Sequence, residues 1–254
     1  MSAWAVGLLT FICVFGGALA GLALRSVLPE HHLNDDSKDI VKVVTGLMAT
    51  LSALVLGLLI ASAKNSFDAV NQGFKHAAAQ IIVIDRVLAQ YGPEAEDLRR
   101  LLRSGYAARI DQLFSPGGEG RIGAATALRD ASAMERLNLK LQTLAPADDL
   151  QRALKSRAVQ LVDELAQARW VGYEEANSTT PAGFLVVLVS WLAAMFAGFG
   201  LFAPRHATAI AALAIGAVAV STSIFLIEEM GRPLDGFIAV SSEPMRHALS
   251  VLGK

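Results

Sequence analysis

The sequence predicts an all-α integral membrane protein, with four transmembrane helices and a helical soluble insert between the second and third spans. Hydrophobic residues make up 54% of the chain, more than the roughly 45–50% that is usual for soluble domains. This excess is concentrated in four apolar stretches toward the two ends of the chain. Each stretch has about the 20 residues that a helix needs to cross a bilayer. The middle of the chain shows helical periodicity and no strand pattern.

The four apolar stretches divide the chain into parts. They are residues 3–24, 43–63, 182–203 and 207–227, and none of them contains a charged side chain. We therefore expect the first two spans with a polar loop in 1–63, a soluble domain in 64–178, a transmembrane hairpin in 179–230, and a turn with a short helix in 231–254. Only three residues, Pro204, Arg205 and His206, link the last two spans, which requires an antiparallel hairpin.

An even number of spans on either side of the soluble insert places it on the same side of the membrane as both chain ends. The basic residues that flank the spans are balanced between the two sides, so the positive-inside rule does not decide the orientation. The first residues, Met1 to Trp4, lack the basic charge of a signal peptide, so we expect the first span to be retained. With Cys13 as the only cysteine, no internal disulfide can form, which favours a cytoplasmic insert.

The second span is expected to continue beyond the membrane as one long helix. Apolar residues recur three and four apart from Phe67 to Tyr91, and the first break is Tyr91-Gly92-Pro93. This stripe either packs within a bundle or forms a coiled assembly between subunits. A second helix should begin near Pro93, a third should cover 126–144, and Pro146 with the acids after it should open a fourth. The residues of the fourth helix expected to face inward are Leu150, Leu154, Val159, Val162 and Leu165.

Several function classes are excluded or disfavoured. A net charge of −1 argues against nucleic acid as a partner. The chain has no P-loop, dinucleotide fingerprint, HExxH or nucleophile elbow, so we expect no enzyme activity, no catalytic residue and no cofactor. His31 and His32 are more simply explained by a solvated loop than by a metal site. The absence of ionisable residues within the spans argues against a proton-coupled transporter but permits a channel.

Small residues in the spans predict close helix packing. They recur every four residues in the first three spans: Gly17 and Gly21; Ala49, Ala53, Gly57 and Ala61; Ser190, Ala194 and Gly198. The simpler interpretation is packing within one subunit, and the alternative is that one of these stripes packs between the subunits of an oligomer. Hydroxyl side chains in the second and fourth spans are expected to bond to carbonyl groups of their own helices. They are Thr45, Thr50, Ser52, Ser62, Ser221, Thr222 and Ser223.

The segment after the fourth span has a distinctive order of residues. Glu228 and Glu229 stand at the membrane exit, where they either form a cation-attracting ring in an oligomer or pair with nearby basic residues. Gly231 and Pro233 should end the helix, and Asp235-Gly236 is a turn dipeptide. Ser242 is expected to cap a short helix that has Glu243 and Pro244 in its first turn.

Two segments resemble a mostly bacterial family of bestrophin-like membrane proteins. One runs from Ser62-Ala63-Lys64-Asn65-Ser66-Phe67-Asp68 through Tyr91-Gly92-Pro93 to Leu98-Arg99-Arg100-Leu101-Leu102-Arg103. The other contains Pro233, Gly236, Val240, Ser241, Pro244 and Leu249. The layout of two spans, a helical insert, two spans and a short tail also fits over nearly the whole chain.

The resemblance implies a function. Bestrophins are pentameric anion channels in which the second spans line the pore, so the likeness implies self-association in a cell membrane, the inner membrane of a bacterium, and conduction of inorganic ions. It implies that Thr50, Leu54, Leu58 and Ser62 face the pore and that the small residues pack behind them. The alternative is a non-conducting membrane scaffold or sensor whose helical domain binds a partner.

Overall fold

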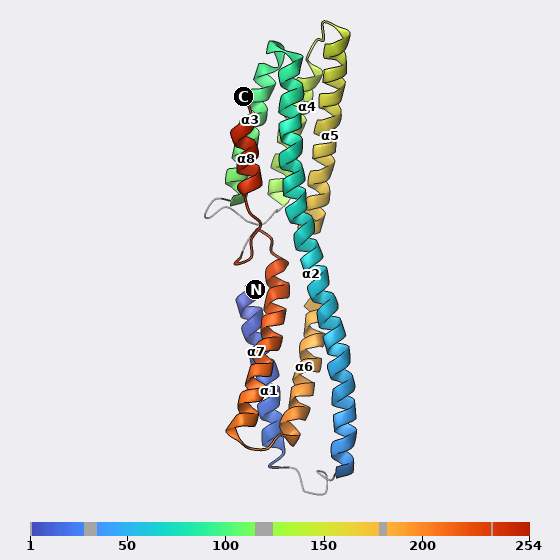
Figure 1. Ribbon diagram of the computed structural model, residues 1–254, viewed down its shortest axis with the longest axis vertical. Helices are drawn as coiled ribbons and strands as arrows, with labels where there is room; N and C mark the ends of the chain where they lie inside the picture. Colours follow the sequence, from blue (N-terminus) through green and yellow to red (C-terminus); the bar gives the residue numbers. More distant parts are fainter. Residues whose placement is uncertain (1, 28–34, 115–123, 178–181, 235) are drawn as a thin grey trace. The chain divides into compact units, whose positions relative to one another are not determined.

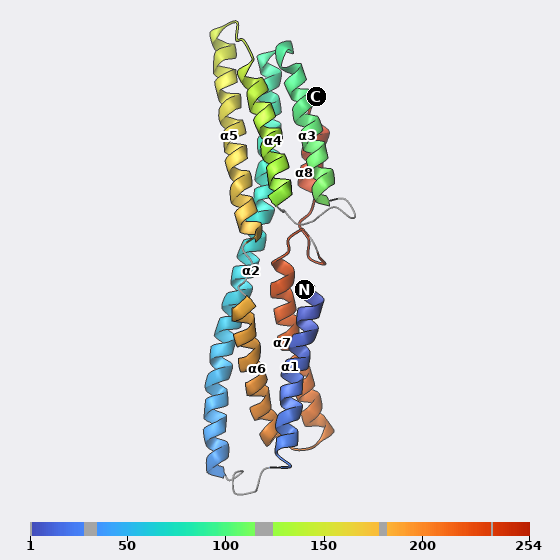
Figure 2. The same ribbon diagram turned by 180° about the vertical axis from the view of Figure 1, so that it is seen from behind.

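The computed structural model describes residues 2–27, 35–114, 124–177, 182–234 and 236–254. Over these residues the chain forms helices and turns, and no strand occurs in the described ranges. His31 and His32 lie outside them. The helices are α1 (Ala3–Leu24), α2 (Asp35–Tyr91), the 3₁₀ helix η2 (Pro93–Ala95), α3 (Glu96–Phe114), α4 (Ala124–Gln142), α5 (Asp149–Asn177), α6 (Ala182–Phe202), α7 (Ala207–Met230) and α8 (Glu243–Val251), drawn in Figures 1 and 2.

Four of these helices are long and apolar enough to cross a membrane, namely α1, α2, α6 and α7. The predicted all-α, four-span membrane fold is therefore confirmed. The second span does continue without a break, since α2 is one helix of 57 residues that ends at Tyr91. The fourth span, α7, runs three residues past its predicted end at residue 227, to Met230.

The chain divides into two compact units. The membrane unit comprises Met1–Asn65 and Thr179–Gly231, and the helical unit comprises Ser66–Ser178 and Arg232–Lys254. The first part of α2 belongs to the membrane unit and the rest to the helical unit. Each unit is thus formed by two chain segments that are separated in the sequence by a segment of the other unit.

In the membrane unit, α1 and α6 lie side by side (Figures 1 and 2) because small residues let their backbones meet. A Cβ atom on Gly21 would stand 2.0 Å from the carbonyl oxygen of Ala197, and one on Gly200 would stand 2.0 Å from that of Ala18. A Cβ on Gly17 would stand 2.6 Å from the carbonyl oxygen of Ala193. The small residues of the first span therefore pack within the subunit.

Helix α7 covers another side of α1. The rings of Trp4 and Phe225 lie 4.6 Å apart between their centroids, beside Gly7. The core that α1, α6 and α7 share is apolar and fully buried at its centre, with Val14, Leu188 and Ile224. The first part of α2 contacts this core through Ala49, Val55, Leu56 and Leu59.

The helical unit is a bundle around one apolar core. The stripe on α2 from Ile81 to Tyr91 is buried there, together with residues of α3, α4, α5 and α8. The core includes Ile84, Leu88, Leu102, Ile110, Leu141, Val162, Leu165, Ala248 and Leu252. This part of the stripe is thus used inside the bundle rather than left for a coiled assembly between subunits.

The acids after Pro146 open α5, as expected. The helix begins at Asp149, and the Asp148 carboxylate accepts a hydrogen bond of 2.7 Å from the Gln151 N–H and so caps its first turn. One expectation for α5 differs from the structure. Leu150 was expected to face inward, but its side chain is 66% exposed. It stands in the first turn at the edge of the apolar stripe, whereas Val162 and Leu165 stand near the centre of that stripe and are fully buried.

Candidate functional site

The half of α2 that faces away from its own membrane unit carries two adjacent strips. The first is a strip of large apolar side chains. They are 45% to 72% exposed, and they are Val43, Leu47, Leu51, Leu54 and Leu58. Their spacing of three and four residues places them along one line of the helix. Of the four membrane helices, α2 has the smallest buried share in its most apolar window, 11% against 22% to 28%.

The second strip consists of small residues on the same exposed half of α2. Ala53 and Ala61 are exposed, and a Cβ atom on Gly46 or Gly57 would meet nothing within 4 Å. This contrasts with Gly17 and Gly21, which have the same spacing of small residues but lie against α6. Within the described residues, the small strip of α2 is therefore not covered by its own chain.

The predicted pore-lining residues all lie on this exposed half. Leu54 and Leu58 are each 71% exposed, and Thr50 and Ser62 are exposed. The hydroxyl of Thr50 donates to the carbonyl oxygen of Gly46 at 3.0 Å, so it satisfies its donor within the helix. The structure thus brings the four residues to one exposed surface of α2.

Other hydroxyl groups of the spans are turned inward. Thr45 and Ser52 are buried, and the Oγ1 atom of Thr45 lies against Gly198 of α6. Ser221 and Ser223 donate to the carbonyl oxygens of Val218 and Ala219, each at 3.0 Å. The expected bonds within the helix are confirmed for both serines.

The two acids at the end of α7 differ in burial, and neither is fully exposed. Glu229 is 3% exposed and Glu228 is half-buried. Both take part in interactions within the chain. The burial of Glu229 favours its pairing with other groups over a solvated ring of acids.

The C-terminal motif forms a closed loop that leads into α8. The carbonyl oxygen of Pro233 accepts a 2.8 Å hydrogen bond from the Val240 N–H. Gly236 has a φ of +134°, in a region that favours glycine. Pro244 stands in the first turn of α8, where its missing N–H costs nothing.

Ser242 is the N-cap residue of α8, as predicted, but its side chain makes no capping hydrogen bond. The hydroxyl of Ser241 accepts the Glu243 N–H at 3.1 Å. Ser242 itself has helical backbone angles, φ −75° and ψ −7°, so its side chain does not fold back over the helix N-terminus. Its hydroxyl instead accepts a bond from Nε of Arg246 at 3.2 Å.

One residue that anchors the chain after α8, Asp85, belongs to no motif in the sequence. The carboxylate of Asp85 on α2 accepts the Gly253 N–H at 3.1 Å. Nη1 of Arg86 donates to the main-chain oxygen of Lys254 at 3.0 Å. The available signal was an acid, Asp85, directly after Ile84 in an otherwise apolar stripe.

Among the described residues, no three His, Cys, Asp or Glu side chains stand close enough to hold a metal ion.

Comparison with known proteins identifies the family. A family model for the Bestrophin-like domain matches residues 12–245, and no curated protein matches the chain. A mutant form of a bacterial bestrophin homologue from Klebsiella pneumoniae has the same fold, with a TM-score of 0.73, 11% identity, and coverage of 100% of this chain and 99% of that one.

Two further forms of the Klebsiella pneumoniae homologue give the same result. One has a TM-score of 0.70 at 13% identity and covers 98% of this chain and 99% of its own. The other has a TM-score of 0.69 at 12% identity and covers 97% and 98%. The match of the family model over most of the sequence, supported by this shared fold, shows that the chain belongs to the Bestrophin-like family of membrane proteins.

Proposed function

We propose that this chain is the subunit of an oligomeric ion channel in the cell membrane and that α2 lines its pore. The observation that carries the proposal is the exposed half of α2, where a strip of small residues runs beside a strip of large apolar ones. Membership of the Bestrophin-like family supports the same function. On this proposal the chain is a channel subunit and not an enzyme.

The small strip is suited to a neighbouring subunit. Helices in lipid associate where small residues let their backbones approach, because lipid offers no hydrophobic drive for association. Gly46 and Gly57 have open space where a Cβ would stand, so a second helix can come close to them. In this proposal α2 of one subunit packs by this strip against the adjacent subunit.

The large strip is suited to a hydrophobic constriction. Residues follow one another at about 100° around an α-helix, so the strip with Leu54 and Leu58 faces roughly a quarter-turn away from the one with Gly57. A helix that packs sideways by its small strip therefore directs these leucines toward the axis of a ring. Apolar constrictions gate pores by excluding water, and residues 43–63 contain no charged side chain.

Ion flux through the purified protein in liposomes tests the proposal. Potassium, sodium and chloride gradients are imposed separately, and protein-free liposomes serve as the baseline. We expect flux for at least one ion and a clear increase for Leu58→Ser, because a hydroxyl lowers the barrier to hydration of the constriction. The matched control is Ile215→Ser on α7, since Ile215 is also 71% exposed; its flux should equal that of the wild type.

The other outcomes separate the alternatives. No flux of any ion through folded, oligomeric protein would favour a non-conducting scaffold or sensor whose helical unit binds a partner. Equal increases for Leu58→Ser and Ile215→Ser would place the pore elsewhere than α2.

We also propose that the N-terminus, the helical unit and the C-terminus share the cytoplasmic side. In a Cys13→Ser background, Thr143→Cys reports on the helical unit and His206→Cys on the loop between α6 and α7, and both positions are exposed. A membrane-impermeant maleimide added to intact cells should label His206→Cys alone. Labelling of Thr143→Cys alone would reverse the orientation.

A further inference from the structure

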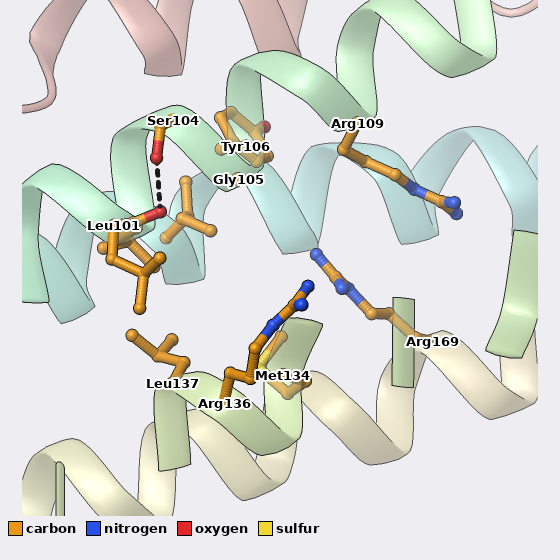
Figure 3. Close-up of a pocket in the computed structure, with 11 residues that line it drawn as sticks. Leu101, Ser104, Gly105, Tyr106, Arg109, Met134, Arg136, Leu137 and Arg169 are labelled. Carbon is orange, nitrogen blue, oxygen red and sulfur yellow. Dashed lines mark hydrogen bonds between the residues drawn. The ribbon is translucent and has the colours of Figure 1, made fainter. Parts of the chain in front are cut away.

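A cavity of about 260 Å³ lies between α3, α4 and α5 in the helical unit. Three arginines line it, each from a different helix: Arg109 from α3, Arg136 from α4 and Arg169 from α5 (Figure 3). Arg109 and Arg169 each interact with another group of the chain, and Arg136 is exposed to solvent. The charges around this cavity are thus met by the chain or by water, and they require no ligand.

The loop between α7 and α8 is held to the helical unit at both of its ends. It comprises residues 233–240, and we call it the Phe237 loop. The carbonyl oxygen of Pro233 accepts the 2.8 Å hydrogen bond from the Val240 N–H, and both residues are buried. The side chain of Leu234 packs against the core of the helical unit. The base of the loop is therefore fixed, and the fold determines which side chain stands at its tip.

The tip of the loop presents one large apolar side chain. Phe237 is 87% exposed, the highest value among the large apolar side chains that the structure describes. The exposed residues beside it, Gly236 and Ala239, are small, and residues 236–242 contain no charged side chain. Single exposed apolar residues are common on protein surfaces. The exposure of Phe237 therefore has meaning only together with the position of the loop in the chain.

The Phe237 loop begins directly after a membrane span. Met230 is the last residue of α7, and Pro233 is three residues further along the chain. The segment from Met230 to Phe237, seven residues on, extends over at most about 25 Å. Phe237 therefore stays within reach of the lipid headgroups of the leaflet that α7 exits.

Aromatic side chains already mark this side of the membrane unit. Helix α1 begins at Ala3, and the ring of Trp4 lies 4.6 Å from that of Phe225 on the last part of α7, between their centroids. Trp4 is 69% exposed. Aromatic side chains are enriched where a membrane protein passes from the acyl chains to the headgroups, and phenylalanine is among the residues that surface-bound segments bury there.

A lipid surface suits this tip better than a protein partner does. A stable protein interface buries about 800 Å² on each side, whereas the exposed neighbours of Phe237 are small and add little apolar area. One ring can insert among lipids, and the uncharged residues 236–242 do not oppose its entry. We propose that Phe237 inserts at the boundary between the headgroups and the acyl chains of the leaflet that α7 exits. The helical unit is then attached to the bilayer surface at this loop.

Photo-crosslinking of the full chain in liposomes identifies what covers the tip. The photoreactive residue p-benzoylphenylalanine is incorporated at position 237, and the liposomes contain phosphatidylethanolamine and phosphatidylglycerol with an alkyne-tagged acyl chain. Irradiation should attach tagged lipid to the protein. The matched control is the same residue at position 150. Leu150 is also exposed, at 66%, and belongs to the helical unit, but it does not follow a span, so it should acquire little or no lipid.

Tryptophan fluorescence gives a second measurement with a natural side chain. The emission added by Phe237→Trp should be quenched by lipids brominated on the upper acyl chain and protected from iodide in the water. The emission added by Leu150→Trp should be quenched by iodide and not by the brominated lipids. The spectrum of the wild type is subtracted, because the chain has three tryptophans of its own. Both variants should keep the melting temperature of the wild type, since both positions are exposed.

Four results would overturn the proposal. They are no attachment of lipid at position 237, a covalent protein dimer in place of the lipid adduct, equal attachment of lipid at positions 237 and 150, and equal quenching of the two added tryptophans by iodide. The dimer would assign the tip to a second copy of the chain. Because neither measurement needs ion flux, their failure would leave the proposed channel function standing, and the reverse also holds.

Discussion

The guanidinium group of Arg99 on α3 forms two hydrogen bonds with the carboxylate of Asp85 on α2. Nε stands 2.9 Å from Oδ1 and Nη2 stands 3.1 Å from Oδ2. The Asp85 side chain is 2% exposed and the Arg99 side chain 14%. The pKa of Arg99 is raised above its ordinary value, chiefly by this hydrogen-bonded pairing and against the effect of burial. The pair joins two helices of the bundle and, through Gly253, the residues after α8.

We predict that Asp85→Asn destabilises the protein by about 3 kcal/mol, since removing one partner leaves the other charge buried and uncompensated. The measurement is denaturant unfolding in detergent, followed by helical circular dichroism. The matched control is Asp97→Asn, which breaks the exposed pair between Asp97 and Arg100 and should cost less than about 1 kcal/mol. Equal losses in the free energy of unfolding of the two variants would show that the buried pair contributes no more to stability than the exposed pair.

The contact between α1 and α6 predicts a sharp difference between two glycines of one helix. Gly21→Ala places a Cβ 2.0 Å from the carbonyl oxygen of Ala197, so the helices must separate, whereas Gly16→Ala meets nothing within 4 Å. Overpacking of this kind costs about 1–3 kcal/mol, and we expect Gly16→Ala to be neutral or slightly stabilising. Thermal unfolding of both variants in the same detergent checks this. A Gly21→Ala variant as stable as Gly16→Ala would contradict the close approach of α1 and α6.

The small strip of α2 predicts an effect on assembly rather than on the fold. Gly57→Leu adds a side chain where the chain itself leaves open space, so the helical content and melting temperature of the monomer should not change. If neighbouring subunits pack on this strip, the variant should dissociate into smaller species. Size-exclusion chromatography with light scattering measures the mass, and Gly16→Leu, at another exposed glycine, is the control. An unchanged mass for Gly57→Leu would remove the strip from the interface.

Alkaline titration tests the environment of Tyr106. Its pKa in the folded protein is raised from 10.0 to about 12, so the folded state retains this proton where the unfolded state has lost it. The stability that Tyr106 contributes is therefore fully present below pH 10 and is lost as the pH rises toward 12. Unfolding curves across this range should fall less steeply for Tyr106→Phe than for the wild type. The tyrosinate absorbance of the wild type should rise in a transition near pH 12 that the variant lacks. Identical absorbance profiles for the two proteins would contradict the burial of Tyr106.

The sequence by itself determined the four spans, the unbroken α2 and the all-helical insert. The reason is that these features depend on properties read along the chain. A charge-free apolar stretch of sufficient length is stable in lipid only if its backbone groups bond within the segment, as in a helix. The three- and four-residue spacing up to Tyr91, followed by Gly92-Pro93, likewise indicates a helix and its end from local chemistry alone.

Only the tertiary structure decided which side of each helix is covered. Gly17 with Gly21 and Ala53 with Gly57 have the same spacing, but the first pair lies against α6 and the second is exposed. Leu150 belongs to an apolar stripe and still lies at the surface. Whether a side chain is buried depends on which helices pack against it, and the residues next to it in the sequence do not determine that.

The same reason explains the two polar features that sequence reasoning missed. Asp85 and Arg99 pair across two helices, and the arginines of the cavity come from three helices spread over 60 residues, from Arg109 to Arg169. Side chains so far apart along the chain show no motif in the sequence. They meet because the apolar stripes of α2, α3, α4 and α5 bury one another, which sets the rotation of each helix and so determines which charged side chains face the same space.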